Sequence, residues 1–385
     1  MSKPKIRFNG FTEDWEQRKL GDVVQITMGQ SPDGSTYSDM PSDYILVQGN
    51  ADLEDGWVKP RVWTTQITKQ ADVGDLIMSV RAPAGAMGKT AYNAVIGRGV
   101  AAIKGNEFIY QLLVKMDKEG YWKKDSTGST FESLNSESIK NAEIKLPSNE
   151  EQNIIGSYFK NLDHLITLHQ RKCEQTKKLK KFMLQKMFPQ NGKAVPEIRF
   201  NGFMEDWEQR KLGEVFQEYS KKNHPELQTL TIIQGSGTVL REESNRNLQY
   251  DKSSLSGYKM VCENDFIVHL RSFEGGLEKS NHNGLISPAY HTFHGDNVDS
   301  RFYYSYFRSY EFIKHKLVPH VYGIRDGRSI DIDGMKTIKI PYTSYDEQKK
   351  IGDYIESLDH LITLHQRKCD ELQNMKKFML QNMFV

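Results

Sequence analysis

The 385-residue chain lacks several features that would place it in a specialised class. It has three cysteines and no Cys-x-x-Cys pair, which excludes a disulfide scaffold and a cysteine-ligated zinc site. It has no apolar run of about 18 residues, and its first residues, MSKPKIRFNGF, hold no apolar signal-peptide core. A net charge of +2 neither demands nor excludes a nucleic-acid partner. We therefore expect a cytoplasmic protein that is not exported and has no contact with a membrane.

The chain does contain a long internal repeat. Segments from the first half return in the second half, 192 or 196 positions later: IRFNGF (6–11 and 198–203), EDWEQRKLG (13–21 and 205–213), LDHLITLHQRKC (162–173 and 358–369) and FMLQ-x-MF (182–188 and 378–384). A repeat of this length is too long for a solenoid. The pattern therefore indicates a duplicated domain.

Each copy ends in a segment with the pattern of one long helix. In the first copy the residues of a heptad-like stripe are Ile155, Phe159, Leu162, Ile166, His169, Cys173, Thr176, Met183 and Met187. Ser148 with Glu151 predicts a capping box at its start, and Ser344 with Glu347 predicts the same in the second copy. Pro189 ends the first helix. About 39 residues at about 1.5 Å each make a rod of roughly 58 Å.

A helix of this length with a single apolar stripe requires a partner. The partner we favour is its own repeat, because a pseudo-two-fold relation would make the pair an antiparallel coiled coil with a globular domain at each end. The alternative is that each helix packs on its own globular domain. The residues expected to pair the helices are Leu162, Ile166, His169, Leu358, Ile362 and His365. The two histidines lie near the helix midpoints, so they should be neighbours, either in direct contact or, as we favour, as packed neutral rings.

The sections between the helices have the pattern of α+β domains. Residues 75–80 and 265–270 predict buried strands, and residues 108–116 and 302–315 predict helices. A last strand should end just before each long helix. The predicted order is an α+β domain over 1–147, a helix over 148–189, a linker over 190–197, a second α+β domain over 198–342 and a second helix over 343–385.

The contrast between identical helices and divergent domains has a functional interpretation. Two copies of one helix surface can dock two copies of one partner, whereas two unlike domains can bind two different targets. Neutral drift is the alternative, because loops change faster than packed helices. Drift poorly explains why the polar run at 169–172 is unchanged in the second copy. We therefore favour the functional interpretation.

At these residues the chain resembles the DNA-specificity subunits of type I restriction–modification enzymes. The motifs that carry the resemblance are Trp-Glu-x-x-x-Leu-Gly (15–21 and 207–213), Pro-x-x-x-Glu-Gln (147–152) and Leu-Asp-x-x-Ile (162–166 and 358–362). The second copy departs from the pattern, because two more residues separate its proline from Glu-Gln (341–348), and Gly-Asp-Leu-Ile at 74–77 becomes Asn-Asp-Phe-Ile at 264–267. The resemblance covers the whole layout but is specific mainly in the helices and in the motifs that open each domain.

The resemblance implies that each globular domain is a target-recognition domain for one half of a bipartite, asymmetric site on double-stranded DNA. The helices would set the spacing, and roughly 58 Å is less than two duplex turns of about 34 Å. They would also dock two methyltransferase subunits, which use S-adenosylmethionine to methylate adenine, while restriction (motor and nuclease) subunits that use ATP and Mg can join. This chain itself would bind no cofactor and would not be an enzyme. The alternative is a protein–protein adaptor on a coiled-coil repeat without DNA binding.

Fragments that imitate catalytic motifs are incomplete. APAGAMGKTA at 82–91 has Pro83, which lacks an N–H, where a phosphate-binding loop needs its first glycine. Gly-Ser-Gly at 235–237 is too short to indicate a cofactor loop. His291 and His294 are more simply two surface histidines than metal ligands. We therefore expect no catalytic residue and no metal site in this chain.

Basic residues at the same place in both domains suit contacts to phosphate, which is common to both half-sites. The strands at 75–80 and 265–270 align Arg81 with Arg271 and Lys89 with Lys279. Residues of one domain alone suit the reading of bases. The candidates are Gln30, Ser31, Tyr92 and Arg98 in the first domain and Tyr322, Arg325 and Arg328 in the second. For each of them the alternative is an ordinary solvated loop residue.

Overall fold

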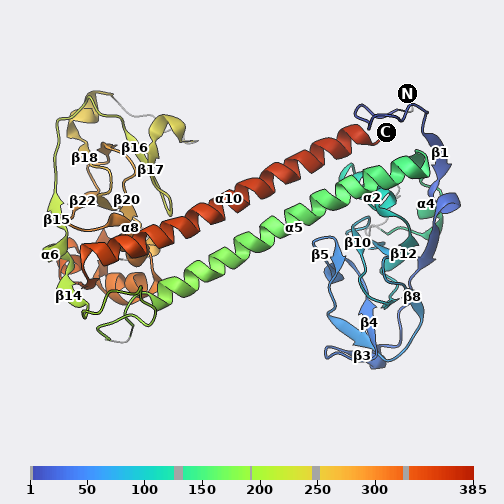
Figure 1. Ribbon diagram of the computed structural model, residues 1–385, viewed down its shortest axis with the longest axis horizontal. Coiled ribbons are helices and arrows are strands. Elements are labelled where there is room, and N and C mark those ends of the chain that lie inside the picture. The colour runs from blue at the N-terminus through green and yellow to red at the C-terminus, as the bar shows by residue number, and fades with distance from the viewer. Residues whose placement is uncertain (1–2, 125–132, 191–192, 245–251, 324–328) are drawn as a thin grey trace. The chain divides into compact units, whose positions relative to one another are not determined.

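The computed structural model describes residues 3–124, 133–190, 193–244, 252–323 and 329–385. The chain divides into two compact units, Met1–Arg171 with His365–Val385 and Lys172–Leu364. Each unit contains one globular part and segments of both long helices, α5 (Asn149–Lys186) and α10 (Tyr345–Met383) (Figure 1). In the described part of the chain, no helix is both long and apolar enough to span a bilayer.

The globular part of the first unit contains two sheets. One has the strand order β2 (Gln25–Met28), β12 (Val100–Lys104), β9 (Leu76–Ser79), β10 (Met87–Lys89), β6 (Trp57–Val58) and β5 (Leu53–Glu54). The other has the order β3 (Tyr37–Ser38), β7 (Val62–Thr64), β4 (Tyr44–Val47), β11 (Ala94–Ile96) and β8 (Lys69–Ala71). A separate antiparallel pair joins β1 (Glu16–Lys19) to β13 (Glu143–Leu146). The helical segments are α1 (Leu20–Val23), η1 (Gly34–Thr36), η2 (Asn50–Asp52), α2 (Glu107–Lys118), α3 (Tyr121–Lys124) and α4 (Ser136–Lys140).

The second unit has a smaller sheet with the order β15 (Gln217–Tyr219), β22 (His291–His294), β19 (Phe266–Val268) and β20 (Glu278–Lys279). Its strand pairs are β14 (Glu208–Lys211) with β25 (Lys339–Tyr342), β16 (Leu230–Ile233) with β17 (Gly237–Leu240), β18 (Lys259–Val261) with β21 (Gly284–Ile286), and β23 (Val321–Tyr322) with β24 (Ser329–Ile330). Its helical segments are α6 (Leu212–Val215), η3 (Arg241–Glu243), η4 (Lys252–Gly257), α7 (Ser272–Gly275), α8 (Ser300–Phe307), η5 (Glu311–Leu317), η6 (Val318–His320) and α9 (Ile332–Lys336).

Strand register confirms that the two globular parts share an antiparallel core. Leu76 of β9 faces Lys89 of β10, and Phe266 of β19 faces Lys279 of β20. Both members of the second pair lie 190 positions after those of the first. The pairs β8–β11 and β18–β21 are related by the same shift. The predicted strands at 75–80 and 265–270 and the alignment built on them are therefore confirmed, although β19 ends at Val268 and Leu270 is exposed.

The two predicted helices have different outcomes. The helix predicted at 108–116 is α2, whose first turn is capped by the Asn106 side chain, which accepts the N–H of Ile109 at 3.0 Å. The single helix predicted at 302–315 is wrong, because α8 ends at Phe307 and the π-helical segment η5 begins at Glu311. The Ser309 hydroxyl accepts the N–H of Phe312 at 3.1 Å, so it starts a new helical segment where a continuous helix was expected.

A buried glutamate marks the start of each long helix. The Arg7 guanidinium donates to both oxygens of Glu151, at 2.7 and 2.8 Å, and Arg199 donates to Glu347 at 2.6 and 2.8 Å. The predicted capping boxes are thus half right. Ser148 and Ser344 accept the N–H groups of Glu151 and Glu347 at 3.4 Å, as a capping box requires. The two glutamate side chains, however, bind the arginine of an IRFNGF segment.

The glutamine that follows each glutamate ties the long helix to the globular part. The Gln152 side chain accepts from Asn106 Nδ2 at 2.9 Å, and the Gln348 side chain accepts the backbone N–H of Asp299 at 3.0 Å. Asn106 and Asp299 are the cap residues of α2 and α8. The Glu-Gln motif therefore fixes the helix start to the opening segment on one side and to a helix of the globular part on the other.

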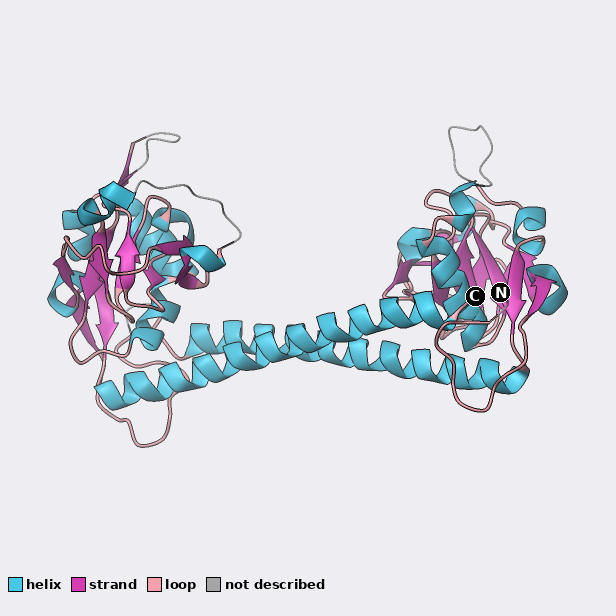
Figure 2. Ribbon diagram, turned by 90° about the horizontal axis from the view of Figure 1, so that it is seen from above, coloured by secondary structure: helices cyan, strands magenta, loops and turns pink. Residues whose placement is uncertain are grey.

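Within each unit the two helix segments pack antiparallel (Figure 2). In the first unit Lys376 Nζ lies 2.6 Å from Asp163, and in the second unit Lys180 Nζ lies 2.5 Å from Asp359, its equivalent 196 positions away. The predicted pairing residues Leu162, Ile166 and Leu358 are buried, and Ile362, whose carbonyl oxygen lies 3.8 Å from Cys173 Sγ, is half-buried. The prediction that each helix pairs with its repeat is therefore confirmed within each unit.

The two predicted histidines meet in the first unit. His169 Nδ1 lies 3.0 Å from His365 Nδ1, so the direct contact between the two rings forms, while the neutral state that we favoured stays a prediction.

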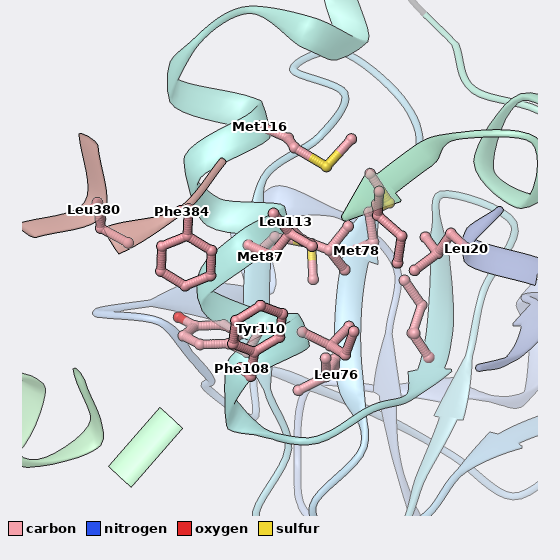
Figure 3. Packing of buried hydrophobic residues seen from close by; sticks show 14 of the residues in the cluster. Leu20, Leu76, Met78, Met87, Phe108, Tyr110, Leu113, Met116, Leu380 and Phe384 are labelled. Carbon is pink, nitrogen blue, oxygen red and sulfur yellow. The ribbon is translucent and has the colours of Figure 1, made fainter. Parts of the chain in front are cut away.

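Each globular core is completed by the end of the helix from the other repeat. In the first unit Phe384 stacks on Phe108 with ring centroids 4.9 Å apart, and Figure 3 shows Phe384 and Leu380 facing α2. In the second unit Phe188 packs in the same way, 4.9 Å from Phe302. The residues that begin each long helix, such as Phe159, are buried in the same cores. Helix pairing and packing on the helix's own globular part, posed above as alternatives, therefore occur together.

A buried aspartate at the start of β9 and of β19 has a different partner in each unit. Asp75 accepts the N–H of Asp72 at 2.9 Å and lies 4.0 Å from Lys104 Nζ. Its equivalent, Asp265, lies 2.6 Å from His294 Nδ1. His294 occupies the position of Lys104, 190 residues later. The hydrogen bond to Asp265 raises the pKa of His294.

We predict that Phe384→Ala lowers the free energy of unfolding of the first unit by about 3–5 kcal/mol, because it leaves a cavity between Trp15 and Phe108. Urea unfolding followed by hydrogen exchange in α2 measures the change. The control is Phe378→Ala on the same helix, whose ring is 55% exposed and whose loss should change stability by less than about 0.5 kcal/mol. Equal effects of the two substitutions would show that Phe384 is not part of this core.

The His294 interaction predicts a pH dependence confined to the second unit. Because the folded-state pKa is raised above 6.5, the stabilisation is complete below the unfolded-state value and is lost as pH rises through the folded-state value. The ring is half exposed and screened by solvent, so we expect a loss of roughly 0.5 kcal/mol as pH rises through and above the ordinary range of histidine. Hydrogen exchange in β19 and β22 measures it. His294→Lys, which copies the first unit, should abolish the dependence, and its persistence would assign the effect to another group.

Candidate nucleic-acid interface

Segments that are distant in the sequence meet at the end of the first sheet where β12 begins. The N–H of Gln30 donates to the carbonyl of Ile96 at 2.9 Å, and the N–H of Arg98 donates to the Ser31 hydroxyl at 3.2 Å. Gln30 and Arg98 are exposed, and Ser31 is half-buried. The structure thus brings together three of the residues predicted to read bases.

Arg81 lies at this same end. The N–H of Val80 donates to the carbonyl of Gly99 at 2.9 Å, so the residue after β9 lies beside the turn that carries Arg98. We call Gln30, Ser31, Arg81 and Arg98 the sheet-end cluster. It contains a residue predicted to bind phosphate and residues predicted to read bases.

Glycines allow the close backbone approach that builds this cluster. A Cβ atom on Gly29 would lie 2.1 Å from the carbonyl oxygen of Gly97, and one on Gly99 would lie 2.0 Å from that of Gln48. Any larger residue at either place would force the segments apart. The position of Arg98 therefore depends on these glycines.

The sheet-end cluster carries positive charge without an internal counter-charge. Arg81 and Arg98 are exposed, and no carboxylate of the described chain forms an ion pair with either guanidinium. A guanidinium is a planar set of donors that matches phosphate oxygens and the major-groove edge of guanine. The cluster is therefore suited to an anionic ligand with hydrogen-bond acceptors.

Lys89 and Tyr92 lie at the opposite end of the sheet, because Lys89 pairs with Leu76 at the start of β9. The Lys89 side chain is 12% exposed, and its Nζ lies 3.0 Å from Glu107 and 4.4 Å from the Tyr110 ring centroid. Tyr92 is 41% exposed. The structure does not bring these residues to the sheet-end cluster, and their contact with DNA stays a prediction.

In the second unit Arg271 occupies the end of the sheet equivalent to Arg81 and is exposed at the start of α7. Lys279 lies at the other end and donates to the Asn264 side chain at 3.2 Å, and burial lowers its pKa. Tyr322 is 60% exposed and pairs with Ser329 across the β23–β24 hairpin. Arg325 and Arg328 lie outside the described residues.

The sequence analysis did not identify two further candidate residues near Arg271, His269 and Tyr290. The rings of His269 and Tyr290 lie 6.2 Å apart, and His269 Nδ1 accepts the N–H of Arg271 at 3.3 Å. Burial lowers the pKa of His269. The comparison of basic residues common to both copies could not identify these two residues, because neither has a basic counterpart in the first copy. The shift of 190 residues could have identified Tyr290, because it aligns Tyr290 with Val100, two residues after Arg98.

The fragments that imitate cofactor and metal motifs have structural partners. The buried Glu278 carboxylate accepts the N–H groups of Gly235 and Gly237, at 2.8 and 3.1 Å, so these donors already have an acceptor. His291 Nδ1 lies 2.7 Å from Glu218, and His294 is held by Asp265 as described above. These contacts give the glycine turn and both histidines a role within the fold.

The helix segments of each unit carry equivalent exposed apolar residues. We call Leu165, Leu168, Met375 and Phe378 the first helix patch, and Leu361, Leu364, Leu179 and Phe182 the second. The residues of one patch lie 196 positions from those of the other. In each patch the two residues on one helix are three positions apart, so they lie on the same side of it. Their recurrence at equivalent positions of both repeats makes these residues candidates for an interaction surface.

Comparison with known proteins identifies the family. The chain matches the type I restriction modification DNA specificity domain twice, over residues 12–178 and 204–374. It is 32% identical over 187 residues to the putative type I restriction enzyme MjaX specificity subunit of Methanocaldococcus jannaschii, a match that spans 46% of this chain and 43% of that subunit. It is 24% identical over 394 residues to the MjaVIII specificity subunit of the same organism, which spans 95% of this chain and 91% of that one.

The fold is similar to a crystal structure of the type I restriction–modification S subunit from M. genitalium, with a TM-score of 0.65, 15% identity and coverage of 100% of this chain and 99% of that one. The two matched domains cover most of this chain and repeat along it as its sequence does. The chain therefore belongs to the type I restriction–modification DNA specificity family.

Proposed function

We propose that this chain is the sequence-specific DNA-recognition subunit of a type I restriction–modification complex. Each globular part reads one half of a bipartite, asymmetric site on double-stranded DNA. The observation that carries the proposal is that the two units share the same strand register but have different side chains at the equivalent ends of their sheets. Arg98 of the first unit, for example, corresponds to Pro288 of the second. A common framework with different end residues is what two different half-sites require.

The sheet-end cluster has a division of labour in this proposal. Arg81 and Arg271 are equivalent and contact phosphate, which fixes the position of the duplex without reading its sequence. Gln30, Ser31 and Arg98 have no counterpart of the same type in the second unit and reach base edges. Tyr322 serves the second half-site. The adaptor without DNA binding has no comparable feature to support it.

The helix patches supply the second part of the function. Two equivalent apolar patches dock two copies of one methyltransferase subunit, which uses S-adenosylmethionine and methylates adenine in each half-site. Restriction subunits that use ATP and Mg join this core in the cytoplasm. The chain described here contributes recognition and spacing, while its partners supply the chemistry.

We predict that Arg98→Ala weakens binding to the cognate duplex by about 5- to 150-fold, because one bidentate base contact contributes about 1–3 kcal/mol of discrimination. Methylated adenines mapped with the wild-type complex define the duplex, and binding is then measured at fixed salt. Arg18→Ala is the control, because Arg18 is also exposed but pairs with Glu16. If Arg98→Ala methylates the same sites at the wild-type rate, Arg98 does not read bases.

We predict that Met375→Asp with Phe378→Asp removes one methyltransferase subunit from the complex, and that Leu179→Asp with Phe182→Asp removes the other. A buried charge without a partner cancels the gain from apolar contact. Native mass spectrometry counts the bound subunits. Gln185→Asp, an exposed site on α5 outside both patches, should leave two bound. Retention of both subunits by the two patch variants would place the docking surface elsewhere.

A further inference from the structure

A groove of about 920 Å³ lies in the first unit between the β5–β6 hairpin, α2 and the two helix segments. Trp57 lines it from the hairpin, Tyr110 and Lys118 from α2, Lys160 from α5 and Lys377 from α10. All of its walls belong to the first unit. The groove is at the Lys89 end of the sheet and is thus separate from the sheet-end cluster.

Some of the basic groups in this groove are neutralised within the protein. Lys115 Nζ lies 2.9 Å from Glu119, Lys376 lies 2.6 Å from Asp163, and Lys89 is held by Glu107. Lys118, Lys160 and Lys377 differ from these, because no carboxylate of the described residues forms an ion pair with them. The groove therefore has an excess of positive charge.

The charge excess is concentrated around Lys118. Partial burial and the charges of Lys376 and Lys377 lower the pKa of this side chain, against the opposing effect of Asp163 and Asp117. Lys118 and Lys377, which form no ion pair with a described carboxylate, both line the groove, and like charges gathered along one groove repel. An anion placed among them would relieve this cost. The cluster is thus an electrostatic site for an anion rather than a set of independent surface lysines.

The place of the groove favours a nucleic acid over an acidic peptide, because it lies at one end of the sheet whose other end carries the sheet-end cluster. Trp57 is 46% exposed, and its ring centroid lies 4.9 Å from Lys89 Nζ. Tyr110 forms the wall beyond it. Tyr110 is buried, so Trp57 is the ring of this pair that a ligand can reach, and the lysines are the groups that suit a phosphate backbone.

The second unit does not repeat this arrangement. The counterpart of Lys160 is Glu356, which accepts from Arg301 at 2.8 Å. α8 has 8 residues where α2 has 12, so it ends before the positions that would correspond to Lys115 and Lys118. The excess charge is therefore a property of the first unit, added to the shared framework.

We propose that this groove binds the sugar–phosphate backbone of the DNA that flanks the half-site read by the first unit. Lys118, Lys160 and Lys377 contact phosphates without regard to sequence. β9 spans 4 residues, or about 13 Å, so the groove and the sheet-end cluster are within reach of one duplex. The inference rests on the proposed function, because it adds a flanking contact on one side of the recognised site.

The test uses the complete complex with its methyltransferase subunits. Binding is measured against salt for a cognate duplex with about 20 flanking base pairs beyond the first half-site and for one trimmed close to it. Lys160→Gln with Lys377→Gln changes two exposed helix residues and should preserve the fold. We expect the slope of log K against log salt to fall by about 1.8 in magnitude on the long duplex only, because each lost phosphate contact removes about 0.9. The methylated sequence should be unchanged.

The matched control is Lys181→Gln with Lys350→Gln. It removes the same charge from exposed positions of the same two helices in the second unit, and Lys181 is the repeat equivalent of Lys377. It should leave the slope unaltered. A separate arm adds ATP as a free phosphate ligand, which should not remove the advantage of the long duplex. Lys118→Gln in a third variant should lower the slope by about 0.9 in magnitude, half the effect of the double substitution, again on the long duplex only.

The outcomes separate this inference from the function on which it rests. A groove variant with normal sequence-specific methylation and an unchanged salt slope would overturn the groove contact and leave the proposed function intact. An equal loss on long and trimmed duplexes, or complete competition by ATP, would also overturn it. Absence of sequence-specific binding by the wild-type complex would instead remove the proposed function, and the groove contact with it.

Discussion

A buried carboxylate at the first turn of each long helix holds the structure together. Glu151 and Glu347 are almost fully buried, and such a charge is stable only with its arginine in place, since loss of one partner typically costs about 3–5 kcal/mol. Around it converge the opening segment, the helix start and, through the next glutamine, the cap of α2 or α8. The position of the long helix relative to the globular part is therefore fixed at Glu151 in the first unit and at Glu347 in the second. The candidate DNA contacts of each globular part are thereby held in place relative to the helix.

The helices also explain why one segment is kept identical. Residues 162–173 pack against residues of their own repeat, as the His169–His365 contact in the first unit and the Cys173–Ile362 contact in the second show. Residues 162–173 pair with residues 358–369, which have the same sequence. A substitution in one of these segments therefore changes only one side of the contact and leaves the other side unmatched. Each helix also begins in one core and closes the other through Phe188 or Phe384. The same surface must satisfy both tasks, and this restricts change more than burial alone.

Much of this framework could be predicted from the sequence, because periodicity and repeat spacing are local properties. The strands, α2, the antiparallel pairing and the alignment of Arg81 with Arg271 follow from them. The break between α8 and η5 could not be predicted, since it depends on a single serine cap within a pattern that reads as one helix. Nor could the partner of Lys89, because Glu107 reaches it only through the fold. Spacing along the chain identifies equivalent residues, but it does not say which end of a sheet they share or which carboxylate lies beside them.

The first turns of the long helices diverge between the repeats, whereas the segment that pairs near the helix midpoints is unchanged. Residues 149–161 and 345–357 differ at most positions, including Lys160 and Glu356, whereas residues 162–173 and 358–369 are identical. The start of each helix therefore changes together with the domain on which it packs. Lys160 carries positive charge into the groove of the first unit, while Glu356 neutralises Arg301 in the second. The unit that recognises a half-site is thus larger than the globular part, since it includes the first turns of the helix that follows.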